Sequence, residues 1–271
     1  MQKGFFVFVL VVLLTLMSSS SSQAQYFVFD EENYDQASDV EAAVGAALKF
    51  FGSVVGGGFF HTADLHSAGG FDVGIRGVIA NVPEDFKTLP VFSEQDFVGL
   101  AFLHGSVGLP GNFELFGRFF YFPLGDGQDV SLTPPRADSR GGVTLIGGGL
   151  KYGLVQLPGL PKVMVMGAYH ALLVPSEFDF GTVGTLSLKA VASYSLPILT
   201  VYLGGGIDFT RLELDADLPF FPDLAGESFT ENQPHFTVGA KVTPFPLLHV
   251  NGSYTFSEFK SFDLGIGVSF R

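Results

Sequence analysis

The sequence predicts an all-β fold, an antiparallel transmembrane β-barrel of about ten strands with a short N-terminal amphipathic helix. Three observations predict it: a leader-like apolar start, alternation of apolar with small or polar residues from residue 71 onward, and expected strand links that are alternately long and short. After Met17, no apolar run is long enough for a helix that spans a bilayer. A mature chain that enters a membrane must then form a closed barrel, because only helices and closed barrels satisfy every backbone hydrogen bond in lipid.

Residues 1–24 have the pattern of a signal peptide. Lys3 gives a positive start, residues 5–17 form a short apolar core, and small residues precede the expected cleavage site. We expect the mature chain to begin at Gln25 and to be exported to the outer membrane of a bacterial cell. An uncleaved anchor helix is the alternative interpretation of the same segment.

The composition excludes several classes of function. With 27 acidic against 14 basic residues the chain repels phosphate, so nucleic acid is not an expected partner. Cysteine is absent, which excludes disulfides, thiolate nucleophiles and cysteine-based metal sites. Charged residues make up 15% of the chain beside 31 Phe and 35 Gly, which is too apolar for a disordered acidic chain and unusual for a water-soluble domain.

Residues 25–70 form an N-terminal segment in which one helix is expected. Ser38 and Glu41 have the spacing of a capping box, and the apolar residues around them recur at the spacing of one helical face. These apolar residues are Val40, Ala43, Val44, Ala47, Leu48 and Phe51. The pattern predicts a helix over about 39–51.

An amphipathic helix must cover its apolar stripe, so this one is expected to act as a plug in the lumen or as a contact beneath it. Docking at the periplasmic rim is the preferred version, because about eight strands already fill a barrel with side chains. Residues 52–58 are the expected hinge into the strands.

Residues 71–271 are the predicted barrel. Its ten strands are expected near 71–82, 97–109, 112–122, 141–153, 162–173, 182–195, 197–210, 234–243, 247–257 and 262–270. The last strand shows the alternation most plainly, with Leu264 and Ile266 on one face against Asp263 and Gly265 on the other.

The links between these strands favour a membrane barrel over a soluble one. Long or medium links near 83–96, 123–140, 174–181 and 211–233 follow odd-numbered strands, and short links near 110–111, 154–161, 196 and 244–246 follow even-numbered ones. Outer-membrane barrels have short periplasmic turns and longer external loops. The short link 258–261 breaks this rule. An even number of strands leaves both ends of the barrel on the periplasmic side.

The end of the chain, Gly267-Val268-Ser269-Phe270-Arg271, resembles the closing strand of bacterial outer-membrane proteins. Those strands commonly finish in an aromatic residue that the barrel-assembly machinery recognises, so the resemblance implies this machinery as a partner during biogenesis. Arg271 after the aromatic residue is a departure from the pattern.

Residues 58–63, GFFHTA, and 69–74, GGFDVG, are similar to the start of an uncharacterised family of exported bacterial proteins, mostly from the Bacteroidetes and their relatives. That family has no assigned activity. The resemblance therefore implies location and architecture rather than chemistry.

Few motifs point to chemistry. Glycine runs at 56–58, 147–149 and 204–206 lack the Lys-Ser/Thr and the strand-to-helix context of nucleotide loops, so no cofactor is expected. His61, Asp64 and His66 could contribute to a metal site, but a polar hairpin is the preferred interpretation and no metal site is assigned. The other histidines, His104, His170, His235 and His249, lie on different expected strands, and no catalytic residue is assigned.

Charged side chains on the expected inner face are the more informative group. These candidate lumen-facing residues are Asp72, Arg76, Glu114, Arg118, Lys151, Lys189, Asp208, Lys241 and Asp263. Opposite charges that offset the cost of burial are the preferred interpretation. A permeation path would use the same side chains to orient a polar solute.

The hypothesis for function is therefore an outer-membrane barrel in contact with lipid, either a passive channel for a small solute or a structural component of the envelope, without enzymatic activity. A soluble exported barrel that binds a small apolar ligand is one alternative. An outer-membrane barrel hydrolase is the other.

Overall fold

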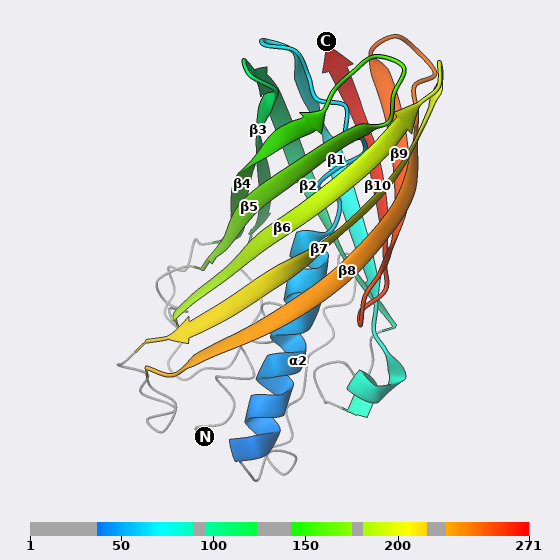
Figure 1. Cartoon of the computed structure of the whole chain (residues 1–271). Coiled ribbons are helices and arrows are strands. Elements are labelled where there is room, and N and C mark those ends of the chain that lie inside the picture. Colours follow the sequence, from blue (N-terminus) through cyan, green and yellow to red (C-terminus); the bar gives the residue numbers. More distant parts are fainter. Residues whose placement is uncertain (1–36, 89–95, 124–141, 175–180, 216–225, 271) are drawn as a thin grey trace.

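A computed structural model describes residues 37–88, 96–123, 142–174, 181–215 and 226–270 of the chain. Ten antiparallel strands form a closed barrel in which each strand pairs with its neighbours in sequence and β1 closes the ring on β10 (Figure 1). The strands are β1 (Phe71–Asn81), β2 (Phe97–Leu109), β3 (Phe113–Pro123), β4 (Gly142–Val155), β5 (Lys162–Leu173), β6 (Gly181–Ser195), β7 (Leu199–Leu214), β8 (Ser228–Val242), β9 (Leu248–Phe256) and β10 (Ser261–Phe270). The predicted fold class is confirmed.

Two strands are longer than predicted. β7 and β8 remain paired down to Glu213 and Ser228, so part of the predicted long link 211–233 is strand. The prediction missed this ladder because the residues after Glu227 are mainly polar and show no apolar alternation. The inner face of this extension packs against a helix within the barrel, where Thr210 and Leu212 of β7 are buried. This packing stabilises the longer strands.

The links divide the barrel into two ends. Short links 110–112, 156–161, 196–198 and 243–247 lie together with the end of β10, and we call this the short-link end (Figure 1). The other strand ends, and the short link between β9 and β10, lie at the opposite end, which we call the long-link end. A 3-10 helix, η2 (Glu84–Thr88), follows β1 there.

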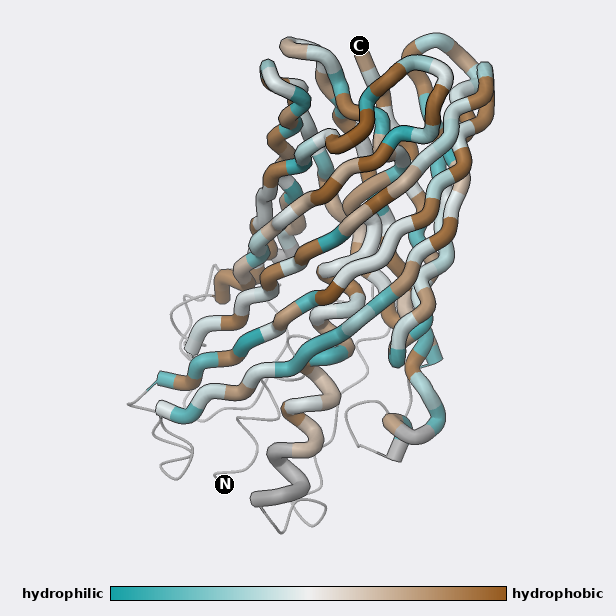
Figure 2. The backbone as a smooth tube through the Cα atoms, in the orientation of Figure 1, coloured by the Kyte–Doolittle hydropathy of each residue, from teal (hydrophilic) through white to brown (hydrophobic). Residues whose placement is uncertain are grey.

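Side chains alternate between an apolar outside and a more polar inside, and Figure 2 shows this alternation of colour along the strands. In β10 the outward residues Phe262, Leu264, Ile266 and Val268 are all exposed. The interior is mixed, with buried polar and charged wall residues beside buried apolar clusters. No helix within the described ranges is long and apolar enough to cross a membrane.

The helix α2 (Ala37–Gly56) enters the barrel at the long-link end, with its C-terminal part inside the lumen and its N-terminal part projecting beyond the strand ends (Figure 1). It begins close to the predicted start but continues past Gly52, so the predicted hinge is mostly helix. Phe50, Val54 and Val55 are fully buried, and the stripe residues from Ala43 to Phe51 are buried with them. Wall residues surround the helix on several sides. The preferred expectation of docking at a rim was wrong, since the helix packs against wall residues inside the lumen.

A narrow helix makes this placement possible. Side chains added at Gly52 or Gly56 would collide with Thr210 and Asp208 of β7, and one at Gly45 would meet Glu231 of β8. Glycine at these positions lets the helix backbone approach the wall. The expectation that ten strands leave little room was correct in principle, but it did not allow for so slender a helix.

Residues 57–70 continue from the helix through the remaining lumen to the short-link end. Gly58 has a positive φ of 64°, which turns the chain just after the helix. The ring of Phe60 then packs against Tyr202 of β7, and the amide of Gly69 donates to the carbonyl of Gly108 beside the first short link. Residues 37–70, which we call the plug, therefore pass along the inside of the barrel before β1 begins.

Candidate functional site: the occupied lumen

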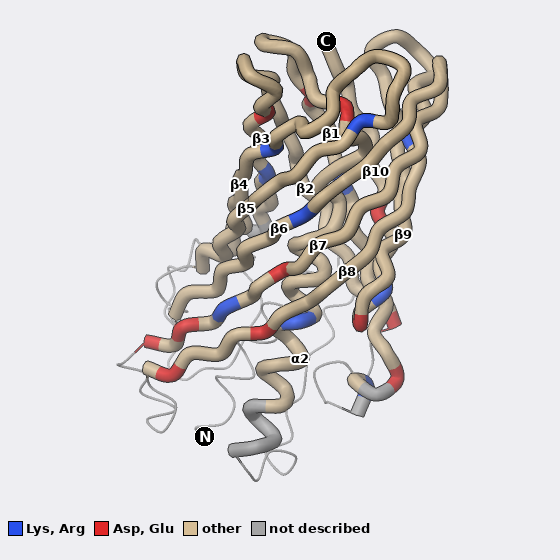
Figure 3. Tube along the Cα trace, viewed as in Figure 1, with Lys and Arg blue, Asp and Glu red and all other residues tan. Residues whose placement is uncertain are grey.

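The structure buries all nine of the charged residues assigned to the inner face of the barrel, each with 6% exposure or less. They are Asp72, Arg76, Glu114, Arg118, Lys151, Lys189, Asp208, Lys241 and Asp263. Figure 3 shows acidic and basic residues distributed along the strands. Most of them contact either the plug or a partner of opposite charge, as described below.

Arg118 of β3 binds the end of the helix. Its Nη1 donates to the carbonyl oxygens of Val55, at 3.0 Å, and Gly57, at 2.9 Å. The guanidinium also lies over the rings of Phe102, 3.8 Å from the centroid, and Phe59, at 4.6 Å. The last carbonyl groups of a helix carry partial negative charge, so a cation at this position stabilises them.

Lys189 of β6 supplies a second cation at the same helix end. Its Nζ donates to the carbonyl of Gly56 and lies 3.6 Å from Oδ1 of Asp208. The other carboxylate oxygen of Asp208 lies 3.1 Å from Nδ1 of His235. The last turn of α2 has no basic residue of its own, so the barrel wall provides both cations.

Arg76 connects the plug to its own strand, β1, and to β9. Its Nη2 lies 2.9 Å from Oδ1 of Asp72, 2.9 Å from Nδ1 of His61 on the plug, and 3.2 Å from Nε2 of His249 on β9. The same guanidinium also donates to Asn251. The His61 and His249 rings stack with their centroids 4.6 Å apart.

His61, Asp72 and His249 are the group in the described ranges whose ligand atoms approach within 4.8 Å of one another, close enough to share a metal ion. The hydrogen bonds oppose that use. Arg76 donates into Nδ1 of His61, which leaves the proton of a neutral ring on Nε2, the atom facing Asp72. The guanidinium of Arg76 already supplies a positive charge between Asp72 and the two histidines. We therefore assign no metal ion to this group.

The three residues considered for metal binding from the sequence are not brought together. Asp64 lies 3.9 Å from Lys162, while His61 and His66 bind different strands. The participation of His249 was missed, although its inward position in the alternation of β9 placed it on the lumen side.

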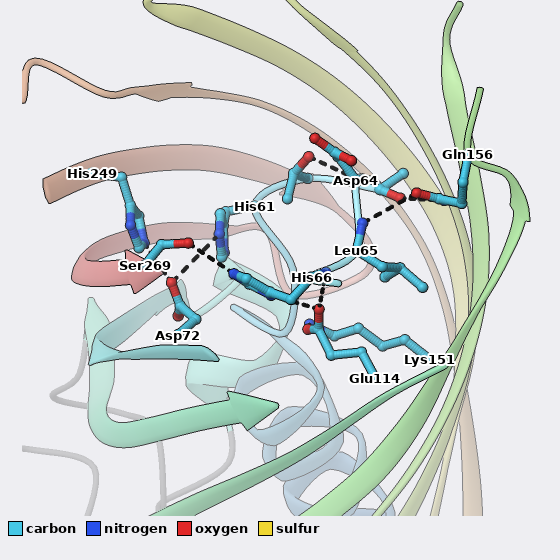
Figure 4. Close-up of polar contacts among 12 residues, drawn as sticks. His61, Asp64, Leu65, His66, Asp72, Glu114, Lys151, Gln156, His249 and Ser269 are labelled. Atoms are coloured by element: carbon cyan, nitrogen blue, oxygen red, sulfur yellow. Dashed lines mark hydrogen bonds and ion pairs between the residues drawn. The ribbon is translucent and has the colours of Figure 1, made fainter. Parts of the chain in front are cut away.

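His66 makes a third connection between plug and wall (Figure 4). Its Nδ1 lies 2.7 Å from Oε2 of Glu114, which also accepts from the His66 amide, and its Nε2 lies 2.8 Å from Oγ of Ser269. Lys151 donates to the other oxygen of Glu114 at 2.7 Å. A hydroxyl, an imidazole and a carboxylate in sequence are the arrangement that activates a serine nucleophile.

Three backbone amides of the described residues at this trio are already bonded. The amide of Ser269 donates to the carbonyl of Leu247, and the amide of Gly70 donates to the carbonyl of Ser67. The His66 amide is held by Glu114. Among the described residues, the trio therefore serves first as a tie between the plug and strands β3 and β10.

The remaining interior is tightly filled, with polar contacts beside an apolar cluster that includes Phe59 and Phe60. Asp263 of β10 accepts from Ser253 at 2.9 Å and from Thr255 at 3.4 Å. A small cavity beside Gly56–Gly58, lined by Lys189 and Asp208 among others, has room for about one water molecule. A cavity of this size does not accommodate an apolar ligand.

Comparison with known proteins gives a family and several distant barrels. A model described as a family of unknown function (DUF6588) matches residues 91–270. No curated protein matches the chain. The family match agrees with the expected membership of a family without assigned activity, although residues 58–74 lie outside the matched range. The bacterial group remains a prediction.

Among solved structures, the chain is similar to the N-terminal β-barrel domain of Pseudomonas aeruginosa OprF, with 14% identity over 73% of this chain and 99% of that one and a TM-score of 0.31. It is also similar to the transport unit of the autotransporter AIDA-I from Escherichia coli, with 11% identity over 85% and 98% and a TM-score of 0.37. The Acinetobacter baumannii outer membrane channel DcaP gives 10% identity over 78% and 100% and a TM-score of 0.30.

Proposed function

Since the chain belongs to the family of unknown function DUF6588, we propose a function from its own structure: an outer-membrane β-barrel whose pore is closed by its N-terminal segment. The single observation that carries the proposal is that cations of the barrel wall bind backbone carbonyls of the plug. Arg118 and Lys189 do so at the end of α2. Wall charges of this kind hold an occupant in place, whereas those of a permanently open channel face water.

The exterior supports a membrane location. Large apolar side chains are exposed on every strand, for example Leu103 of β2 and Leu203 of β7. A soluble barrel that binds an apolar ligand would need the reverse, a hydrated outside and an apolar cavity inside. In lipid, the same exposed side chains are favourably placed.

The links support an orientation. Outer-membrane barrels place their short turns in the periplasm, so we propose that the short-link end is periplasmic and the long-link end external. Glu258 at the long-link end is paired with Lys49 of the helix, at 3.2 Å. The helix would then enter the lumen from the external side.

A barrel closed in this way acts as a channel only when the plug leaves. Solutes would pass after the ties at Arg118, Arg76 and His66 are broken, and the exposed wall charges would then line the pore. A barrel whose plug never leaves would be a structural component of the envelope instead.

Conductance in a planar bilayer distinguishes these cases. Deleting residues 37–56 should leave a barrel that folds, shown by a heat-modifiable gel shift, and that conducts far more than the intact protein. The matched control is Thr230→Ala on the outer face of β8, which should conduct like the intact protein. A folded deletion variant with unchanged conductance would overturn the closed-pore proposal.

A barrel hydrolase is the second candidate, favoured by the Ser269–His66–Glu114 arrangement alone. It is the weaker proposal because the nearby amides of Ser269 and Gly70 are already bonded. A fluorophosphonate probe tests it directly. Labelling that disappears in Ser269→Ala and in His66→Gln would support it, and an unlabelled folded barrel would overturn it.

A further inference from the structure

The short-link end carries a ring of exposed apolar side chains. Every one of its four links contributes large apolar residues, in or next to the turn. They are Leu109, Leu157, Leu160, Leu196, Ile198, Phe245 and Leu247. Two of them, Phe245 at 66% and Ile198 at 61%, are among the most exposed apolar side chains of the described chain. At the seam between β1 and β10 the stacked rings of Phe71 and Phe270 complete the ring.

The links themselves contain no charged residue in 109–112, 157–161, 196–199 or 244–247. Periplasmic turns that point into water would be expected to carry polar side chains, because exposed apolar patches of this extent are unusual in contact with water. The ring therefore requires a non-aqueous neighbour.

The backbone of the links is also suited to an environment with little water. Each link contains proline, which has no N–H group to satisfy. Several remaining amides bond within or between links: Leu196 donates to Leu199 at 2.7 Å, and Thr243 donates to Ile198 at 2.8 Å. Satisfied backbone groups are the condition for entry into a membrane.

Strand length places the membrane boundary at this end. A strand needs about 9–11 tilted residues to span the hydrocarbon core. β9 has 9 residues and β10 has 10, so these strands have no length to spare. Their outward side chains are apolar up to Val268 and Phe270, next to the links.

At the opposite end, the β7–β8 extension is polar on its outer face. Its outward residues include Arg211, Glu213 and Thr230, and they are exposed. On these two strands the apolar outer face ends before the extension, whereas Phe97 of β2 is exposed at that end of the barrel.

We propose that the short-link ring is a lipid-binding surface inserted into the interfacial region of the periplasmic leaflet, where it contacts glycerophospholipid acyl chains near the glycerol backbone. The ring is continuous with the apolar outer face of the strands, which favours lipid over a protein partner. Without charge, it has no means of selecting an anionic headgroup. This inference rests on the proposed membrane location and specifies its depth.

The absence of tryptophan from the chain allows a direct test. Full-length single-tryptophan variants Phe245→Trp and Ile198→Trp are reconstituted in phosphatidylcholine vesicles whose acyl chains carry bromine either close to the glycerol or close to the chain end. Leu264→Trp on the outer face of β10 is the lipid control, and Thr230→Trp on the β8 extension is the water control. Folding of each variant is checked by its heat-modifiable gel shift.

The tryptophan fluorescence of both ring variants should be quenched more by bromine close to the glycerol than by bromine close to the chain end. The extent of this quenching should be within about twofold of the strongest quenching seen for Leu264→Trp. Thr230→Trp should be quenched by aqueous acrylamide and not by bromine. Ring tryptophans that respond only to acrylamide, or to neither quencher, would overturn the proposal that the ring binds lipid. If bromine still quenched Leu264→Trp in that case, the membrane location of the barrel would stand. An unquenched Leu264→Trp would overturn the membrane location itself.

Discussion

Nη1 of Arg118, on the barrel wall, lies 3.0 Å from the carbonyl oxygen of Val55, in the last turn of the internal helix. These residues are 63 positions apart, and the contact joins the barrel wall to the N-terminal helix. The wall thus supplies the cation that the end of the helix lacks.

Replacing Arg118 should loosen the plug without unfolding the barrel. Arg118→Met keeps much of the packing against Phe102 but loses two charge-assisted hydrogen bonds to the helix end. Interactions of a cation with a helix C-terminus contribute up to ~2 kcal/mol, so amide hydrogen exchange in residues 45–56 should become about tenfold or more faster. Arg211→Met, on the exposed part of β7, is the control and should leave that exchange unchanged. Equal protection in both variants would mean that the helix does not depend on the wall cation.

Filling the space beside Gly52 should displace the helix. The Cβ of Gly52→Ala would collide with Oγ1 of Thr210, so this variant should show greater conductance in a planar bilayer than the intact protein. Gly52→Ala combined with Thr210→Gly removes the obstacle and should restore the closed state. Gly77→Ala is the matched control, because its Cβ meets nothing nearer than 3.8 Å. Failure of the double variant to close would argue that the contact is not the cause.

An arginine on the outer face should impair assembly according to its place on the barrel. Leu264→Arg lies in the apolar belt, where a basic residue at the bilayer midplane costs roughly 2–4 kcal/mol. Thr230→Arg lies on the polar β7–β8 extension and should be tolerated. The folded fraction in each case is given by the heat-modifiable gel shift of membrane extracts. Equal folded fractions of the two variants would contradict the placement of Thr230 outside the apolar belt.

The buried pair of Glu114 and Lys151 should show strong coupling. Removing one partner of a buried ion pair typically costs about 3–5 kcal/mol, whereas replacing both with uncharged residues costs less. Glu114→Gln should therefore lower the free energy of unfolding, measured by urea titration in lipid vesicles, more than Glu114→Gln with Lys151→Met. His66 also binds Glu114, so some loss should persist in the double variant. A double variant as unstable as the sum of the single ones would indicate no coupling between the pair.

The strands were largely predictable because the alternation that defines them is local. In β10, each residue from Phe262 to Phe270 takes the face that the sequence assigns to it. The end of β8 nearest Ser228 was not predictable, because its inner face covers a helix instead of facing an open lumen. A strand with polar residues on both faces shows no alternation of apolar and polar residues from which it could be predicted.

The position of the helix was harder to foresee than its existence. The capping box and the apolar stripe that predict the helix are local features of the sequence. Its position in the barrel depends instead on contacts with Thr210, Asp208 and Glu231, which follow it by more than 150 residues. Phe50, off the predicted stripe, was the available indication, since a helix with apolar residues on several sides is usually enclosed. The inward charges were identified by alternation, whereas their contacts with backbone carbonyls depend on the same distant packing.

The passage of residues 57–70 along the inside of the barrel has a consequence for folding. This segment leads directly into β1, and β1 bonds to β10, the last strand to be synthesised. A helix is about 10–12 Å across with its side chains, so drawing α2 through a finished ring lined by Arg76 and Arg118 would disrupt most of the interior. Rolling the sheet around the segment avoids that passage. We therefore expect the strands to close around the plug, with the β1–β10 ladder formed last.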